Sequence, residues 1–197
     1  HTATVTFVEN LFDDDSNLLD LGQIPIQGVP AAVAPLPEHG KVYDPADLVL
    51  LESLDLRSLM EVNPIASLNL YHGAGRLAYG KWKVRPWYEV ELSIGKNGYP
   101  GIPKSFVAHT DDGYVIEMHR TGGGPRGEPE KGLKDLASAG DRTVFGQWIK
   151  GKLERAGALK EGDVIDKTTF DDYGGDRLEF RHVSEGVLYM SFLPTNQ

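Results

Sequence analysis

Residues 106–119 read FVAHTDDGYVIEMH and predict two short strands joined by a tight turn. Apolar and polar residues alternate on both sides of the run Thr110-Asp111-Asp112-Gly113, which is typical of half-buried strands. An Asp-Gly pair between two such runs favours a hairpin, because glycine accepts the positive φ that tight turns need. We therefore expect a β-hairpin with arms at residues 106–108 and 114–119.

Further strands and short helices are expected around this hairpin. Residues 87–94 alternate apolar and charged side chains and predict a strand. Residues 143–156 predict a helix whose buried stripe contains Phe145 and Trp148, with Gln147, Lys150 and Glu154 on the outside. Shorter patterns predict a helical turn at 168–173 and an antiparallel pair at 178–183 and 187–193. The fold class expected is mixed α/β, mainly β.

The segment before residue 84 has a different character. Residues 45–62 predict a helix, because Pro45 suits a first turn and leucines recur at helical spacing up to Asn63-Pro64. We expect residues 1–83 to form an acidic N-terminal extension or subdomain and residues 84–197 to form the main domain. Because the chain does not begin with Met, it is expected to be a piece of a longer protein.

Composition excludes several classes of protein. The chain has 197 residues, of which 40% are hydrophobic and 25% charged, as in ordinary globular domains. It has no cysteine, so a disulfide framework, a thiolate metal site and a cysteine nucleophile are excluded, and a cytoplasmic location is expected. No apolar run approaches the roughly 18 residues of a membrane helix, so no membrane partner is expected.

The charge is unevenly distributed along the chain. The net charge of −9 argues against a nucleic-acid partner when the chain is taken as a whole. Residues 81–160, however, hold fourteen basic side chains against ten acidic ones, a net charge of +4. The flanking segments 1–80 and 161–197 carry net charges of −8 and −5. A basic middle segment between acidic flanks keeps a nucleic-acid partner open.

One cluster of polar side chains has a spacing that could support metal chemistry. His109, Asp111 and Asp112, with Glu117 and His119 on the other arm, could supply two imidazoles and a carboxylate to a divalent ion. The alternative is a surface turn with charged hairpin faces, which we favour. The chain has neither a Gly-x-Ser-x-Gly elbow nor a Gly-rich phosphate loop followed by Lys-Ser/Thr. We therefore expect no catalytic residue, no metal and no cofactor.

Two loops instead carry side chains suited to DNA. Residues 95–105 and 120–138 are rich in glycine, proline and polar residues, and they concentrate the side-chain types that pair with base edges or grip phosphates. The candidate DNA-binding residues are Lys96, Asn97, Tyr99, Lys104, Ser105, Arg120, Thr121, Arg126, Lys131, Lys134, Asp135 and Ser138.

Several motifs, spread over residues 84–193, resemble a known family. They are Arg85-Pro86-Trp87-Tyr88-Glu89-Val90-Glu91-Leu92, Thr110-Asp111-Asp112-Gly113-Tyr114, Phe145-Gly146-Gln147-Trp148-Ile149-Lys150-Gly151-Lys152-Leu153-Glu154, Gly157-Ala158-Leu159 with Gly162-Asp163, and Asp172-Tyr173-Gly174. Together they resemble the C-terminal DNA-recognition domain of NgoFVII-type restriction endonucleases. That domain is itself similar to the plant B-three DNA-binding domain.

The resemblance implies an open seven-stranded β pseudobarrel with short flanking helices. Two arms of such a domain enter the major groove of double-stranded DNA, and by chain order they map to residues 95–105 and 120–138. It also implies a non-catalytic target-recognition domain of a restriction endonuclease, with the nuclease domain elsewhere in the parent chain. Lys150, Lys152 and Arg155 are expected to add positive charge or phosphate contacts.

The second arm departs from the family pattern at two positions. The family has a Lys-Asn-Leu-Arg-Ser-like run where this chain has Lys134-Asp135-Leu136-Ala137-Ser138. Asp135 and Ala137 therefore either lose base contacts or imply a different recognition sequence, and Asp135 could accept from a cytosine amino group.

Two other classes of function stay open. One is a small metal-dependent β-barrel hydrolase that uses His109, Asp111, Asp112 and His119. The other is a protein-interaction module that docks through the acidic N-terminal segment. A steep fall of affinity with salt distinguishes DNA binding from both.

Overall fold

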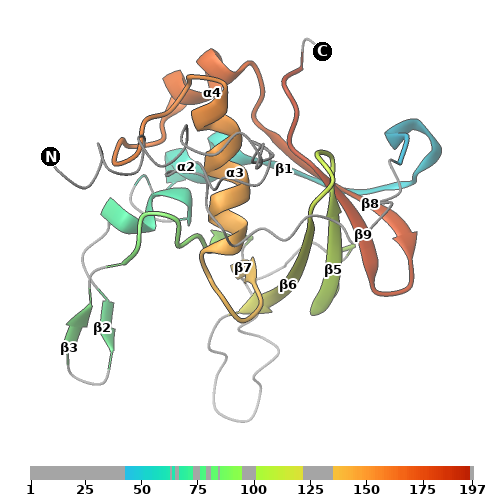
Figure 1. The fold of residues 1–197 in the computed structure, drawn as a ribbon, viewed down its shortest axis with the longest axis horizontal. Helices are drawn as coiled ribbons and strands as arrows, with labels where there is room; N and C mark the ends of the chain where they lie inside the picture. Colours follow the sequence, from blue (N-terminus) through green and yellow to red (C-terminus); the bar gives the residue numbers. More distant parts are fainter. Residues whose placement is uncertain are drawn as a thin grey trace, which may run out of the picture. The chain divides into compact units, whose positions relative to one another are not determined.

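The computed structural model describes residues 43–62, 64, 67–72, 76–78, 81–83, 85–94, 101–121 and 135–195. Seven strands of this part form one curled sheet in the order β1-β8-β9-β5-β6-β7-β4 (Figure 1). Neighbouring strands are antiparallel except β5 and β9, which are parallel. The strands are β1 (Leu50–Asp55), β4 (Leu92–Ser93), β5 (Ser105–Thr110), β6 (Val115–Thr121), β7 (Asp135–Ser138), β8 (Arg177–Ser184) and β9 (Val187–Ser191).

Short helices and a second, small sheet complete the described part. The helices are η2 (Pro45–Asp47), α2 (Leu56–Val62), η3 (Ser67–His72), α3 (Val144–Arg155) and α4 (Lys167–Tyr173), and β2 (Arg76–Ala78) pairs with β3 (Lys81–Lys83). The predicted mainly β, seven-stranded fold is confirmed, as are α3, α4 and the antiparallel pair β8–β9. In these segments no helix is both long and apolar enough to span a membrane.

The predicted hairpin is confirmed in strands β5 and β6. Val107 faces Glu117 and His109 faces Val115 across the pair. Gly113 has a φ of 86°, and its N–H donates to the Thr110 carbonyl oxygen (3.1 Å). The Thr110 hydroxyl group also accepts from the N–H of Tyr114 (2.8 Å), which closes the turn on itself. The turn is thus fixed by local chemistry, as the sequence predicts.

Among the described residues, helix α3 provides the two largest side chains that are fully buried. Phe145 and Trp148 are buried, at 0% and 1% exposed, and their rings stack with centroids 6.2 Å apart. They belong to one apolar cluster with residues of the sheet, such as Phe106 and Phe180. The predicted core role of both aromatic residues is confirmed.

The predicted helix over 45–62 is helical only near its two ends, in η2 and α2, and is wrong over residues 50–55. Residues 50–55 form strand β1, which pairs with β8 so that Leu54 faces Leu178. Leu54 of β1 is fully buried, and so is Leu56, the first residue of α2. The helix begins only after Asp55, whose carboxylate accepts from the N–H of Ser58 (2.9 Å). Pairing with a distant strand outweighs the leucine spacing.

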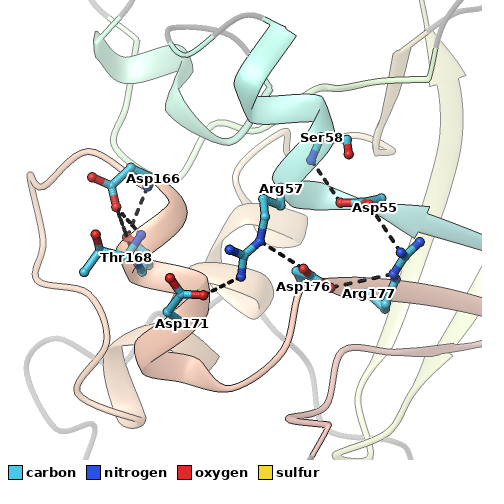
Figure 2. A network of polar contacts seen from close by, with 9 residues as sticks. Asp55, Arg57, Ser58, Asp166, Thr168, Asp171, Asp176 and Arg177 are labelled. Atoms are coloured by element: carbon cyan, nitrogen blue, oxygen red, sulfur yellow. Dashed lines mark hydrogen bonds and ion pairs between the residues drawn. The ribbon is translucent and has the colours of Figure 1, made fainter.

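A polar network ties this early segment to the end of the chain (Figure 2). Arg57 on α2 donates to Asp171 on α4 (2.7 Å) and to Asp176 before β8 (3.0 Å). Arg177 pairs with Asp55 (3.3 Å) and with Asp176 (3.6 Å). Residues 50–62 therefore contribute to the same domain as the strands that follow residue 84. Residues 1–42 of the expected N-terminal extension lie outside the described residues.

The predicted strand over 87–94 is reduced to β4, residues 92–93. Trp87 and Tyr88 lie in a turn in which the N–H of Glu89 donates to Pro86 (3.0 Å). This segment lies along α3 rather than along another strand, and the contacts with α3 remove it from the sheet. Glu89 and Glu91 do not form a solvated face, because Arg85 and Arg142 pair with them.

The contacts between this segment and α3 fall on one stripe of the helix. Gly146, Lys150 and Glu154 are four residues apart and therefore share a face. Tyr88 lies so close to Gly146 that an ideal Cβ there would be 1.8 Å from the Tyr88 carbonyl oxygen. Lys150 donates to the Trp87 carbonyl oxygen (2.5 Å), and Glu154 accepts from the Trp87 indole (3.1 Å). The prediction that Lys150 faces solvent is wrong, because residues 87–90 cover it, and Glu154 is only partly exposed.

Candidate nucleic-acid interface

Four strand ends meet at one edge of the sheet. Ser93, the last residue of β4, pairs with Asp135, the first residue of β7. Thr121, the last residue of β6, also pairs with Asp135. The N–H of Arg120 donates to the carbonyl oxygen of Lys104 (2.8 Å), which brings the end of β6 to the start of β5. We call this edge the rim and define it by Ser93, Lys104, Ser105, Arg120, Thr121 and Asp135.

The rim is the common root of both predicted arms. The chain leaves it after β4 and returns at β5, and it leaves again after β6 and returns at β7. The structure therefore brings together the bases of two segments that are separate in the sequence. Segments 95–100 and 122–134, which run between these strand ends, lie outside the described residues, as do the candidates Lys96, Asn97, Tyr99, Arg126, Lys131 and Lys134.

The described candidates divide into a surface group and one buried residue. Lys104 and Ser105 are exposed, and Arg120, Thr121 and Asp135 are half-buried at the rim. Ser138 lies at the other end of β7 and is 1% exposed. Its hydroxyl group donates to the Asp141 carbonyl oxygen (2.7 Å) and accepts from the N–H of Phe145 (3.2 Å). Ser138 therefore joins β7 to the start of α3 and does not offer its side chain to a ligand.

The hairpin carboxylates are held by protein groups. Asp111 pairs with Lys152 (2.5 Å) and accepts from the N–H of Phe192 (2.8 Å). Asp112 accepts from the indole of Trp148 (2.7 Å) and from the hydroxyl group of Thr110 (2.8 Å). Burial raises the pKa of Asp112, but these hydrogen bonds and the Lys152 charge outweigh it and hold that pKa below its ordinary value.

The histidines of the hairpin lie apart from these carboxylates. His109 Nδ1 is 3.2 Å from the hydroxyl group of Tyr43, and burial lowers the pKa of His109. His119 faces Ser105 across the β5–β6 pair, near the rim. Within the described segments, no three His, Cys, Asp or Glu side chains are placed to hold a metal ion. The four residues of the hydrolase alternative, His109, Asp111, Asp112 and His119, therefore do not form a metal-binding cluster in the described part of the chain.

The lysines expected to contact phosphates are internal. Lys150 is 0% exposed, and its Nζ lies 3.9 Å from the centre of the Trp87 ring in addition to its hydrogen bond with the Trp87 carbonyl. Lys152 is 9% exposed and is paired with Asp111. Arg155 is exposed but pairs with Asp112 (3.3 Å). The expectation of phosphate contacts from Lys150 and Lys152 is wrong, because the helix turns both side chains into the protein.

The burial of Lys150 leads to a prediction about stability and pH. Burial lowers the pKa of Lys150 to about 7, against the opposing effect of Glu154. Between that pH and the ordinary lysine value near 10.4, the unfolded chain binds more protons than the folded one. The free energy of unfolding should therefore rise with pH in this window, by up to about 1.4 kcal/mol per pH unit.

Urea unfolding of the wild type and of Lys150→Met from pH 6 to 10 measures this effect. The wild type should gain stability relative to the variant above pH 7, and no such divergence is expected for Lys160→Met, because Lys160 is exposed. Parallel curves for the wild type and Lys150→Met would contradict the prediction.

A curled seven-stranded sheet with the roots of two long segments at one rim is the architecture of an open pseudobarrel. The sequence model of the NgoFVII C-terminal B3-like DNA-binding domain family matches residues 51–184, about two thirds of the chain. The chain belongs to this family, so it is a DNA-binding domain whose partner is double-stranded DNA. A search of curated proteins found no match.

The family match confirms the resemblance drawn from the motifs and extends it toward the N-terminus. It begins at residue 51, whereas the motifs start at residue 85. The family match starts earlier because it includes β1, which is a strand of the seven-stranded sheet. Glu52 on β1, which belongs to none of these motifs, accepts a hydrogen bond from the N–H of Gly101 at the base of the first arm (2.8 Å).

Proposed function

We propose that this domain recognises a specific sequence in double-stranded DNA through the two segments rooted at the rim, which enter the major groove. It supplies target recognition to a restriction endonuclease whose nuclease domain lies elsewhere in the parent chain, in the cytoplasm. The observation that supports the proposal most is the meeting of four strand ends at one rim. Two segments held at a common rigid base can grip one stretch of duplex from two sides.

Side-chain chemistry assigns roles within this interface. An Arg guanidinium can donate two hydrogen bonds to guanine O6 and N7, which reads a base, whereas a Lys ammonium suits a phosphate. We therefore assign base readout to Arg120 and Arg126 and phosphate contacts to Lys104, Lys131 and Lys134. Asp135, at the root of the second arm, can accept from a cytosine amino group.

The experiment starts with selection of bound sequences from random duplexes by the wild-type chain. Affinities for the selected and for a random duplex are then measured over a range of salt concentrations. Arg120→Ala and Arg126→Ala should lower the preference for the selected duplex by about 1 to 3 kcal/mol each. Lys104→Ala and Lys131→Ala should weaken both affinities together and flatten the salt slope.

Lys160→Ala is the matched control for this series. Lys160 is exposed and follows the last turn of α3. That turn contacts the β5–β6 hairpin turn, which lies at the opposite end of β5 from the rim. Its removal should change neither the preference nor the salt slope. The proposal fails if the wild type binds all duplexes equally. The assignment of roles fails if all four rim and arm variants weaken both affinities by the same factor.

A further inference from the structure

Strand β1 contacts the base of the first arm, although the two are far apart in the sequence. The carboxylate of Glu52 accepts a hydrogen bond from the N–H of Gly101 through Oε1 (2.8 Å). Gly101 lies close against the strand: an ideal Cβ there would be 3.0 Å from Glu52 Cγ and 3.0 Å from Leu51 Cβ. A Cβ at position 101 would therefore force the arm base or β1 to shift by a few tenths of an ångström.

An irregularity in β1 coincides with this contact. The pairing of β1 with β8 shifts register between Leu50 and Glu52, which leaves Leu51 as the extra residue of a β-bulge. Bulges redirect side chains relative to the regular pleat. Both residues that touch Gly101, Leu51 and Glu52, lie at this bulge, so the local backbone of β1 is shaped for contact with the arm base.

The contact continues directly into the rim. Ile102, the next residue, is 1% exposed and belongs to the core. Lys104 follows two residues later, and its carbonyl oxygen accepts from the N–H of Arg120 (2.8 Å). The short path from Gly101 to Ser105 is thus held by β1 at one end and by β6 at the other. A shift at Gly101 would be passed to Lys104 within three residues.

We propose that Glu52 is a positioning residue of the DNA interface, because its hydrogen bond to Gly101 sets where the first arm joins the rim. This inference rests on the proposed function, since it assumes that the rim and its arms read DNA. Glu52 acts through the backbone of Gly101 and does not itself contact DNA. The expected consequence of its loss is therefore reduced discrimination between duplexes rather than reduced folding.

The test compares Glu52→Ala and Glu52→Gln with the wild type. Glu52→Ala removes the acceptor, so the preference for the selected over a random duplex should fall roughly tenfold, the order of one misplaced base contact. Glu52→Gln keeps a carbonyl oxygen that can accept from Gly101, so it should retain most of the preference. Hydrogen exchange at the Gly101 amide, measured without DNA, should be faster in Glu52→Ala and nearly normal in Glu52→Gln.

Two further variants separate positioning from general destabilisation. Glu179→Ala is the matched control, because Glu179 is a half-buried glutamate on the neighbouring strand β8 that pairs with Arg181 (2.8 Å). It should leave the preference unchanged. Gly101→Ala changes the other partner of the contact and should also reduce the preference. Adding Glu52→Gln to Gly101→Ala should not restore the preference, because the added methyl group still displaces the arm base.

The outcomes distinguish the two proposals. If the wild type shows no preference among duplexes, the proposed function fails. If the wild type discriminates and Glu52→Ala discriminates equally well while the Gly101 amide exchanges faster, the function stands and the positioning role is overturned. An equal loss in Glu52→Ala and Glu179→Ala would also overturn it, because the effect would then come from weakening the sheet.

Discussion

Gly146→Ala is expected to destabilise the domain by about 3 kcal/mol or more, a large fraction of the stability of a typical domain. The new Cβ would be 1.8 Å from the carbonyl oxygen of Tyr88 and 2.8 Å from Cγ2 of Val90. The first of these atoms belongs to the backbone, so no side-chain rotation can relieve the clash. Alanine is otherwise a better helix former than glycine, so the expected loss is due to this clash alone.

Hydrogen bonds to α3 keep the backbone of Tyr88 from moving away from the helix. Lys150 holds the Trp87 carbonyl oxygen, and Glu154 accepts from the indole of Trp87 and from the hydroxyl group of Tyr88 (3.2 Å). Moving the backbone of Tyr88 away from α3 would strain these hydrogen bonds on the same helix face. The clash is therefore expected to cost more than an added methyl group in a compliant part of the core.

Gly151→Ala on the same helix is the matched control. A Cβ there would meet only the Nη1 atom of Arg155 at 3.2 Å, the far end of a flexible side chain. Thermal and urea unfolding should show this variant unchanged or more stable by up to about 1 kcal/mol, the helix-propensity gain of alanine. Similar losses in Gly146→Ala and Gly151→Ala would refute the clash as the cause.

Lys152→Met should cost about 3 to 5 kcal/mol at neutral pH, because it leaves a buried carboxylate without its cation. The Asp111 side chain is 2% exposed and lies 2.5 Å from Lys152. Burial already raises the pKa of Asp111 above its ordinary value, although the charge of Lys152 opposes the rise. Without Lys152 this pKa should rise further.

The sign of the pH dependence follows from that rise. A carboxyl group whose pKa is higher in the folded state binds more protons there, so its folded form is favoured at low pH and loses stability as the pH rises. The deficit of Lys152→Met relative to the wild type should therefore be largest near pH 8 and shrink toward pH 5. Urea unfolding at both pH values measures it.

The double variant Lys152→Met/Asp111→Asn tests whether the unpaired charge is the cause. It removes the Asp111 carboxylate that Lys152→Met leaves unpaired, and the amide oxygen of asparagine can still accept from the N–H of Phe192. Most of the lost stability should return, and the stability difference from the wild type should change much less between pH 5 and pH 8 than in Lys152→Met. A double variant as unstable as Lys152→Met at every pH would show instead that packing of the lysine stem dominates.

Local signals in the sequence were sufficient for a large part of the fold. The β5–β6 hairpin follows from its Asp-Gly turn, and α3 follows from a stripe that includes Phe145 and Trp148. Strand β1 could not be recognised, because leucines that suit a helix also suit a strand once β8 supplies a partner. Its assignment depends on a contact more than a hundred residues away.

Charged residues show the same limit. Lys150 and Lys152 lie on a helix in a basic segment, where lysines are usually solvated. Their burial depends on residues 87–90 and on Asp111, which only the folded chain brings to them. The sequence predicts the bounds of both arms. It does not predict that the arms share a root at the rim, because that depends on strand pairing. Glu52 carries no local signal, because its partner Gly101 lies 49 residues further along the chain.

The sheet order has a consequence for the way in which the protein forms during synthesis. The hairpins β5–β6 and β8–β9 join neighbouring stretches of chain and can pair as soon as both strands exist. Strand β1 must wait for β8, which is made about 120 residues later, and β5 must wait for its parallel neighbour β9. Until then the ribosome carries a nascent chain with two unsatisfied strand edges. The last strands to emerge, β8 and β9, are therefore the ones that join β1 to the rest of the sheet.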